Sequence, residues 1–359
     1  MSKIMDSPAA WTAAELDSDR RWLFTLDDQA RRDLVAAVRK AQDPGKTLLD
    51  YHREEFDLGS ASPAIAAAFE EVRRGRGVAL VKGLPRAGLD EKSFELLTWA
   101  IGLHAGVGRP QGKASHYLSA VRDAGTAYRT GTGRGYSSNA ELDFHTDSAD
   151  VVGLSCYNKA AAGGMSITTS SLAAYARMVA EHPALAEWLR RPVHFSRQGE
   201  QAADEAASYP HPIFDEAEGR LFSKWNWNRV TSAQKLEGVP RIDAEQWKAL
   251  ETFDQVVRQP DLAHTMWLEP GDLQIINSHV TLHSRTDFTD HDDPSQKRLL
   301  FRLWLAPPNS DRLPESWRVL YKAVEPGAVR GGITGQHHDE RCKAFEARQA
   351  RALGMTVTS

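Results

Sequence analysis

The segment Phe144-His145-Thr146-Asp147 places a histidine and a carboxylate two positions apart. In an extended segment, residues i and i+2 project to the same side, so both side chains can bind one metal ion. A third ligand from elsewhere in the chain would complete a facial triad, which leaves three coordination positions open. A single His-x-Asp pattern arises easily by chance in a chain with 13 histidines and 48 acidic residues, so other blocks have to support it.

A candidate third ligand lies far downstream. The stretch Pro270-Gly-Asp-Leu-Gln-Ile-Ile-Asn277 is typical of a turn that leads into an apolar strand, and Leu282-His283-Ser284-Arg285 follows it. His279 lies between the two blocks, and spacing alone does not exclude it. We prefer His283, because it follows the strand and precedes a second strand that carries two arginines.

That second strand is Arg298-Leu-Leu-Phe-Arg302-Leu-Trp-Leu305. Alternate side chains of a strand share a face, so Arg298, Leu300, Arg302 and Trp304 point one way and the other residues point into an apolar layer. Two arginines on so apolar a strand are costly to bury without anionic partners. A salt bridge to nearby acids or a solvent-facing edge would explain them, but the adjacent metal motif favours recognition of carboxylates by the guanidinium groups.

The elements that position these residues change character along the chain. The first third is predicted to be helical with one strand, and the region after about residue 115 has short apolar runs separated by Gly, Asp, Asn and Pro, typical of an antiparallel sandwich or barrel. The predicted helices begin at Asp27 or Asp28, at Pro63 and at Lys92, and then at Leu172 (to Arg191) and Asp243 (to Arg258). The predicted strands cover 77–83, 116–121, 151–157, 165–169, 273–276 and 299–305.

These patterns predict one catalytic domain over residues 1–359, in three parts. Residues 1–110 form a helical N-terminal elaboration with one core strand, residues 111–308 form the β core with helical insertions, and residues 309–359 form an irregular C-terminal wrap. The chain has 41% hydrophobic and 26% charged residues, as is ordinary for a globular protein with one substantial core.

Composition also excludes several classes of partner. A net charge of −4, without a basic stripe interleaved with aromatic residues, argues against nucleic acid. Neither a membrane-spanning run nor a signal peptide is visible, so we expect a cytoplasmic protein with no membrane partner. The two cysteines, Cys156 and Cys342, are expected to be reduced. The sequence leaves the oligomeric state open, with a homo-oligomer among the alternatives.

Taken in order, these blocks resemble the taurine dioxygenase-like (TauD/TfdA, clavaminate synthase-like) family of iron(II)/2-oxoglutarate oxygenases. The resemblance extends from about Trp11 to Gly332. The matching blocks are Leu142–Asp147, Gly163-Gly-Met-Ser166, Pro270-Gly-Asp272, Asn277 with Leu282–Arg285, and Arg298–Leu305. Each block alone is ordinary, whereas the ordered set is specific.

The resemblance implies a mixed α+β fold with a mainly β core, a double-stranded β-helix (distorted jelly roll) whose mouth holds the metal. It implies that His145, Asp147 and His283 are the ligands and that Arg298 binds the distal carboxylate of 2-oxoglutarate. A hydroxyl after the double glycine would assist; we choose Ser166, with Thr168 as the alternative. Arg302 would face an anionic group of the substrate or support the cosubstrate. Gln111 lies where amino-acid-oxidising relatives place a substrate contact, and a glutamine in a surface turn is the alternative.

The resemblance further implies Fe(II) as cofactor, with 2-oxoglutarate and O2 as cosubstrates, and a small, anionic or amino-acid-like metabolite as substrate. In related halogenases the carboxylate ligand is missing, so Asp147 argues for hydroxylation, desaturation or another oxidative outcome. The residues alone also fit a zinc hydrolase with the same triad, which would give Arg298 no role, and a non-catalytic jelly-roll binding protein. The cluster Lys224-Trp-Asn-Trp-Asn-Arg229 could line a substrate pocket, although two tryptophans at this spacing favour packing.

Overall fold

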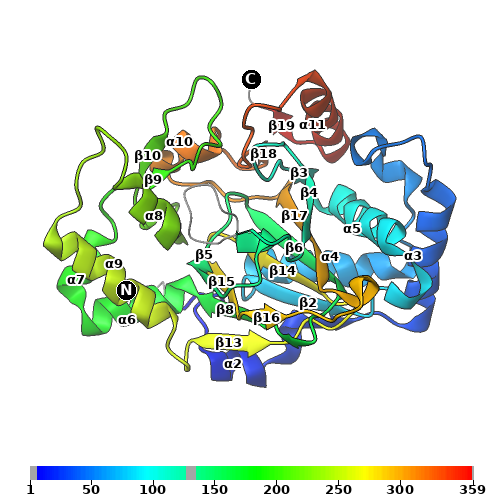
Figure 1. The fold of residues 1–359 in the computed structure, drawn as a ribbon, viewed down its shortest axis with the longest axis horizontal. Helices are drawn as coiled ribbons and strands as arrows, with labels where there is room; N and C mark the ends of the chain where they lie inside the picture. Colours follow the sequence, from blue (N-terminus) through cyan, green and yellow to red (C-terminus); the bar gives the residue numbers. More distant parts are fainter. Residues whose placement is uncertain (1–5, 127–134, 358–359) are drawn as a thin grey trace.

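The computed structural model describes residues 6–126 and 135–357, and its centre is a 7-stranded sheet (Figure 1). In this sheet β1, β2, β14, β6, β17 and β3 follow one another, and β4 also pairs with β17. The strands are β1 (Leu23–Thr25), β2 (Val78–Lys82), β3 (Val107–Gly108), β4 (Leu118–Val121), β6 (Val151–Asn158), β14 (Leu273–Asn277) and β17 (Leu299–Ala306). A mixed α and β fold with a sheet core is thereby confirmed.

A second sheet of 4 strands has the order β13, β8, β15, β5. Its strands are β5 (Leu142–His145), β8 (Ser166–Ser170), β13 (Ala263–Met266) and β15 (Thr281–Arg285). Two-stranded pairs complete the β structure: β7 (Ala162–Gly163) with β16 (Phe288–Thr289), β9 (Val193–Ser196) with β10 (Ser208–His211), β11 (Phe214–Ala217) with β12 (Arg220–Ser223), and β18 (Ala328–Val329) with β19 (Thr356–Val357).

Helices gather on either side of these strands (Figure 1). They are α2 (Ala13–Ser18), α3 (Asp28–Ala41), α4 (Ser62–Arg74), α5 (Glu91–Ala105), α6 (Ser171–Glu181), α7 (Pro183–Trp188), α8 (Trp227–Ala233), α9 (Ala244–Val257), α10 (Arg318–Tyr321) and α11 (Glu340–Leu353). No helix in these ranges is both long and apolar enough to cross a membrane. Both cysteines are buried and free.

Local sequence signals fix most helix starts. The side chain of Asp27 accepts a hydrogen bond from the Ala30 amide at the start of α3, and Asp243 does the same for the Gln246 amide at the start of α9. The helix predicted over 172–191 is divided into α6 and α7 at His182. Pro183 starts the second helix there, because proline has no amide hydrogen to continue the first.

Each end of the chain contains more regular structure than predicted. In the N-terminal part, β1 and β3 join β2 in the large sheet, although only one strand was expected there. These additional strands have only 3 and 2 residues, too few to show an alternating pattern.

The C-terminal prediction of an irregular wrap was wrong, because residues 340–353 form the helix α11. Its buried positions are Cys342, Phe345, Glu346, Gln349 and Ala350, which have helical spacing but include two polar residues. Phe345 packs against Trp99 and Tyr117, and this contact anchors the helix to the core.

Strand β17 separates two hydrophobic clusters. Leu299, Phe301, Leu303 and Leu305 belong to the cluster that includes residues of α3, α4 and α5, whereas Leu300 and Trp304 belong to a second cluster with Val152 and Ile276. The predicted division of this strand into two faces is confirmed. The face that carries Leu300 and Trp304 is the one on which Arg298 and Arg302 lie beside a polar cavity.

Candidate metal centre

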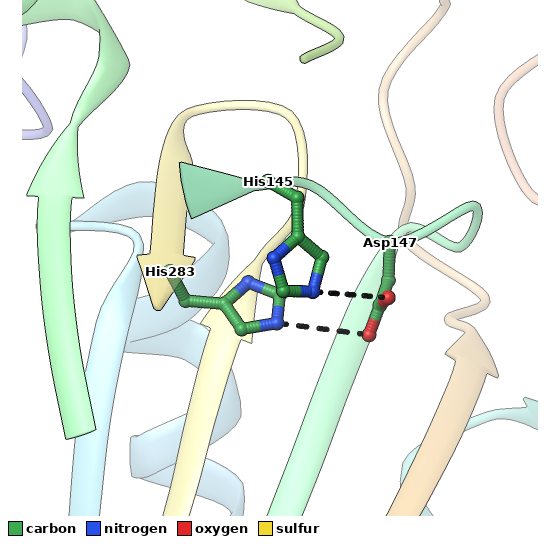
Figure 2. Close-up of side chains that lie close together, drawn as sticks. All are labelled: His145, Asp147 and His283. Carbon is green, nitrogen blue, oxygen red and sulfur yellow. Dashed lines mark ion pairs between the residues drawn. The ribbon is translucent and has the colours of Figure 1, made fainter. Parts of the chain in front are cut away.

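The side chains of His145, Asp147 and His283 come together at one point (Figure 2). His145 ends β5 and is the Cα partner of His283 in the neighbouring strand β15. The Nε2 atoms of His145 and His283 lie 3.9 and 3.8 Å from the two carboxylate oxygens of Asp147. One ligand atom from each residue lies within 4.8 Å of the others, so a single cation can reach all three.

The protonation states of the three groups suit a metal. Burial lowers the pKa of both histidines, that of His283 to about 3, so both rings are neutral near pH 7. Burial alone would raise the pKa of Asp147, but the charge of Arg302 acts against it, and the pKa of the carboxyl stays below its usual value. The Nδ1 atom of His145 donates to the Asp143 carbonyl over 2.8 Å, which leaves the Nε2 lone pair for a ligand bond. Two neutral imidazoles and one carboxylate fit iron(II).

His279, the rival third ligand, lies in a different environment. Its Nε2 atom is 2.9 Å from Asp150 Oδ1, and Arg330 binds the same carboxylate. Among the described residues, the cluster of potential metal ligands contains His283 and not His279.

Asp147 is held by groups that the sequence did not reveal as its partners. Trp304 Nε1 donates to Asp147 Oδ2 over 2.9 Å, and Arg302 Nη1 lies 3.5 Å from the same oxygen. The buried Lys224 Nζ donates to the carbonyl oxygens of Asp147 and Thr146 and to Ser148 Oγ. Lys224 therefore fixes the backbone that follows β5, and the two β17 residues orient the carboxylate.

The triad lines one cavity together with the predicted basic strand. Arg298 is buried there, and burial lowers its pKa to about 10, so it stays charged near neutral pH. Its Nη1 atom has no hydrogen-bond partner, and no carboxylate in the described chain forms an ion pair with its guanidinium. A buried cation in this state is a binding position for an anion.

Ser166 lines the same cavity, whereas its alternative Thr168 is buried and does not. Ser166 Oγ donates to Gln274 Oε1 over 2.9 Å, and Gln274 Nε2 has no hydrogen-bond partner. Gln274 was missed at the sequence level. The only signal was that Gln274 is a polar residue within the apolar strand Leu273–Asn277. There was no reason in the sequence to assign it a chemical role.

Gln111 lies outside the cavity lining and acts on Arg302 instead. Its Oε1 atom accepts a hydrogen bond from Arg302 Nε over 2.9 Å, and its Nε2 atom donates to the Arg302 and Tyr117 carbonyls. Gln111 is only 2% exposed, so the interpretation as a surface turn residue is wrong. The geometry makes it a positioning residue for Arg302.

The segment Lys224–Arg229 combines both roles considered for it. Trp225 is fully buried and packs against Phe253. The polar residues Asn226, Asn228 and Arg229 line the cavity, and Arg229 is paired with Glu200.

Comparisons with known proteins agree with this geometry. Residues 42–304 match the model of the family described as "Taurine catabolism dioxygenase TauD, TfdA family". FR-33289 synthase of Streptomyces rubellomurinus is 28% identical over 320 residues, which cover 88% of this chain and 94% of that protein. A taurine hydroxylase-like protein of Stachybotrys chartarum is 23% identical over 328 residues, which cover 85% of this chain and 82% of that protein.

Two solved structures share the fold at low sequence identity. Asparagine oxygenase, in complex with Fe(II), 3-hydroxyasparagine and succinate, has a TM-score of 0.61 at 18% identity; the match covers 79% of this chain and 93% of that one. The non-heme iron oxygenase OrfP, in complex with Fe and alpha-ketoglutaric acid, has a TM-score of 0.59 at 13% identity, with coverage of 79% and 94%.

Proposed function

Because the chain belongs to the TauD, TfdA family of dioxygenases, we propose that it oxidises a small anionic or amino-acid-like metabolite at the site described above. The enzyme uses iron(II), 2-oxoglutarate and O2, and the oxidation is a hydroxylation or a desaturation. The fold we assign is the double-stranded β-helix. The support for it is that residues of both the 7-stranded and the 4-stranded sheet line the cavity of the triad and that the solved relatives share the fold.

His145, Asp147 and His283 would hold the iron. When bound with 2-oxoglutarate and O2, iron(II) supplies the oxidising power that removes a hydrogen from an unactivated C–H bond. The protein contributes ligands in fixed protonation states, with Trp304 and Arg302 orienting the carboxylate and Lys224 fixing the backbone beside it. Asp147 is buried and the two histidines are partly buried, which limits the access of water to the reacting groups.

The observation that carries the proposal is the uncompensated guanidinium of Arg298 in the cavity of the triad. A dicarboxylic acid that chelates the metal through one end needs a cationic partner for its other end. Arg298 supplies that partner, and Ser166 and Gln274 offer further hydrogen bonds beside it. A zinc hydrolase would leave this buried charge without a function, and so would a non-catalytic binding protein with an accidental triad.

The charge of the cavity favours an anionic substrate. Its described lining contains four arginines and one acidic residue, Asp147; the arginines are Arg229, Arg285, Arg298 and Arg302. Glu200 balances Arg229, and 2-oxoglutarate would offset Arg298 and the metal. Positive charge remains for a carboxylate or another oxyanion of the substrate, with Arg302 closest to the metal ligand Asp147. Two of the solved relatives bind hydroxylated amino acids, which carry such a carboxylate.

The proposal is tested by following succinate formation from 2-oxoglutarate with iron(II) and O2 while amino acids and other small anions are screened. We expect one class of anion to stimulate succinate formation and to be oxidised in equal amount. Hydrolysis of a test compound without 2-oxoglutarate would instead support the zinc hydrolase, and a failure to bind any metal stoichiometrically would support the binding protein.

A further inference from the structure

A second cavity, of about 330 Å³, lies between helix α4, the end of helix α5 and residues 307–311. It shares no lining residue with the cavity of the metal centre. Along β14, Gln274 lines the metal cavity whereas Asn277 lines this second one. Its volume is within the range of sites for small molecules, and the proposed oxidation gives it no role.

Buried polar groups form one wall of the second cavity. Asp150 accepts hydrogen bonds from Arg330, with a shortest distance of 2.6 Å, and lies 2.9 Å from His279 Nε2. The three side chains are at most 5% exposed. Since Asp150 and Arg330 balance each other in charge, this wall is polar without a net charge.

One ring nitrogen of His279 has no hydrogen-bond partner among the described residues. Burial lowers its pKa, so the ring is neutral, and its contact with the Asp150 carboxylate places the single ring proton on Nε2. The Nδ1 atom is then an acceptor, and it has no hydrogen-bond partner in the described chain. A buried acceptor without a partner is unfavourable, and a ligand N–H or O–H group would relieve that penalty.

The rest of the lining offers apolar surface, polar side chains such as Ser62 and Asn309, and one available cation. Its other carboxylates, Glu70 and Asp311, are paired with Arg73 and Arg220. Ile65, Phe69 and Phe222 contribute hydrocarbon surface. The lining arginines Arg73 and Arg330 are paired with Glu70 and Asp150. Arg53 has no ion pair with a carboxylate in the described chain; its Nε atom only donates to His104 Nδ1 over 3.4 Å.

We propose that this second cavity binds a small apolar carboxylic acid that carries one N–H or O–H donor. Its carboxylate would pair with Arg53, its hydrocarbon body would lie against Ile65, Phe69 and Phe222, and its donor would bind His279 Nδ1. This binding does not depend on iron, 2-oxoglutarate or the identity of the oxidised substrate.

Three related probes separate the contributions in calorimetric titrations of the metal-free, full-length protein. Indole-3-acetate has the apolar ring, the N–H donor and the carboxylate. 3-Methylindole lacks the carboxylate, and 1-naphthylacetate lacks the N–H donor. We expect indole-3-acetate to bind one site per chain, 3-methylindole to bind roughly 10- to 100-fold more weakly and 1-naphthylacetate roughly 2- to 10-fold more weakly.

Variants locate the binding site. Arg53→Met should weaken indole-3-acetate roughly 10- to 100-fold, whereas Arg351→Met, at an exposed arginine, should not. Ala66→Trp fills the cavity from an exposed helical position and should abolish binding, whereas Ala67→Trp, at the next exposed position outside the lining, should leave it unchanged. Because these positions are exposed or half-buried, the variants should fold.

Three results would overturn the proposal. They are the absence of saturable binding for all three probes, equal binding by Ala66→Trp and the parent protein, and loss of binding in Arg298→Ala. The last result would place the probe in the metal cavity. None of them bears on succinate formation, so this proposal and the proposed oxygenase activity can fail separately.

Discussion

The indole Nε1 of Trp304 donates a hydrogen bond over 2.9 Å to Asp147 Oδ2, the carboxylate oxygen that also lies 3.5 Å from Arg302 Nη1. Oδ2 thus accepts the indole hydrogen bond and forms an ion pair with the guanidinium. The two groups would fix the orientation of the Asp147 carboxylate towards the metal that the triad would hold.

We predict that Trp304→Phe weakens iron(II) binding roughly 10-fold, because groups that orient a metal ligand typically contribute 10- to 100-fold to affinity. Anaerobic iron(II) titration measures the effect. Trp267→Phe, at a tryptophan that is 40% exposed, is the matched control and should bind iron as the parent does. Equal iron affinity in Trp304→Phe and the parent would show that the hydrogen bond does not support the ligand.

For Arg298→Ala we predict a dissociation constant for 2-oxoglutarate that is roughly 10- to 100-fold higher, since a charge-assisted contact to a carboxylate is lost. The melting temperature should not fall, because the variant removes a buried charge that has no partner carboxylate. Lys297→Ala, at the exposed neighbouring residue, is the control. Unaltered affinity for 2-oxoglutarate would remove Arg298 from the site.

If Arg302 contacts the substrate, Arg302→Ala should consume 2-oxoglutarate and O2 without forming an equal amount of oxidised product. Gln111→Leu should show the same uncoupling to a smaller degree, because Gln111 Oε1 holds Arg302 Nε. Oxygen uptake and product yield, measured together, give the coupling ratio. A ratio in both variants equal to that of the parent protein would reject this role for Arg302.

Glu346 on α11 should make the free energy of unfolding depend on pH in the acidic range. Burial by itself raises the pKa of Glu346, but Arg109 and the hydrogen bonds from His338 and Tyr117 outweigh it and lower the pKa to about 2. A lowered pKa stabilises the folded state fully above the unfolded value of 4.5, and this stabilisation is lost as the pH falls towards 2.

From pH 7 to pH 3 this one group should account for a loss of about 2 kcal/mol in the free energy of unfolding. Denaturant unfolding of Glu346→Gln should lack that part of the pH dependence, whereas Glu340→Gln, at an exposed position of the same helix, should retain it. If Glu346→Gln and the parent lose stability in parallel over this range, the carboxylate is not the linked group.

What could be predicted from the sequence depended on periodicity. The two faces of β17 follow from alternation, and Arg298 and Trp304 line the same cavity as alternation predicts. His283 was preferred over His279 from its place between two predicted strands, and the register of β15 against β5 brings it opposite His145. Spacing along the chain does not contain that register.

Contacts that join distant segments could not be predicted. Lys224 binds the backbone around Asp147, and Gln111 binds Arg302 from the loop between β3 and β4. In sequence, each is a polar residue without a motif. Helix α11 was missed because Glu346 and Gln349 occupy buried positions, where their contacts with Arg109 and with the Leu103 carbonyl replace hydrophobic packing.

The most direct test of the metal centre is anaerobic addition of iron(II) and then 2-oxoglutarate to the parent protein and to Asp147→Ala, with visible absorption recorded. The three-ligand site beside Arg298 predicts a new visible band in the parent that saturates at one iron and one 2-oxoglutarate per chain and is absent from Asp147→Ala. A parent protein that binds iron without producing the band, or a band of equal intensity in Asp147→Ala, would contradict the assignment of these side chains to an iron and 2-oxoglutarate site.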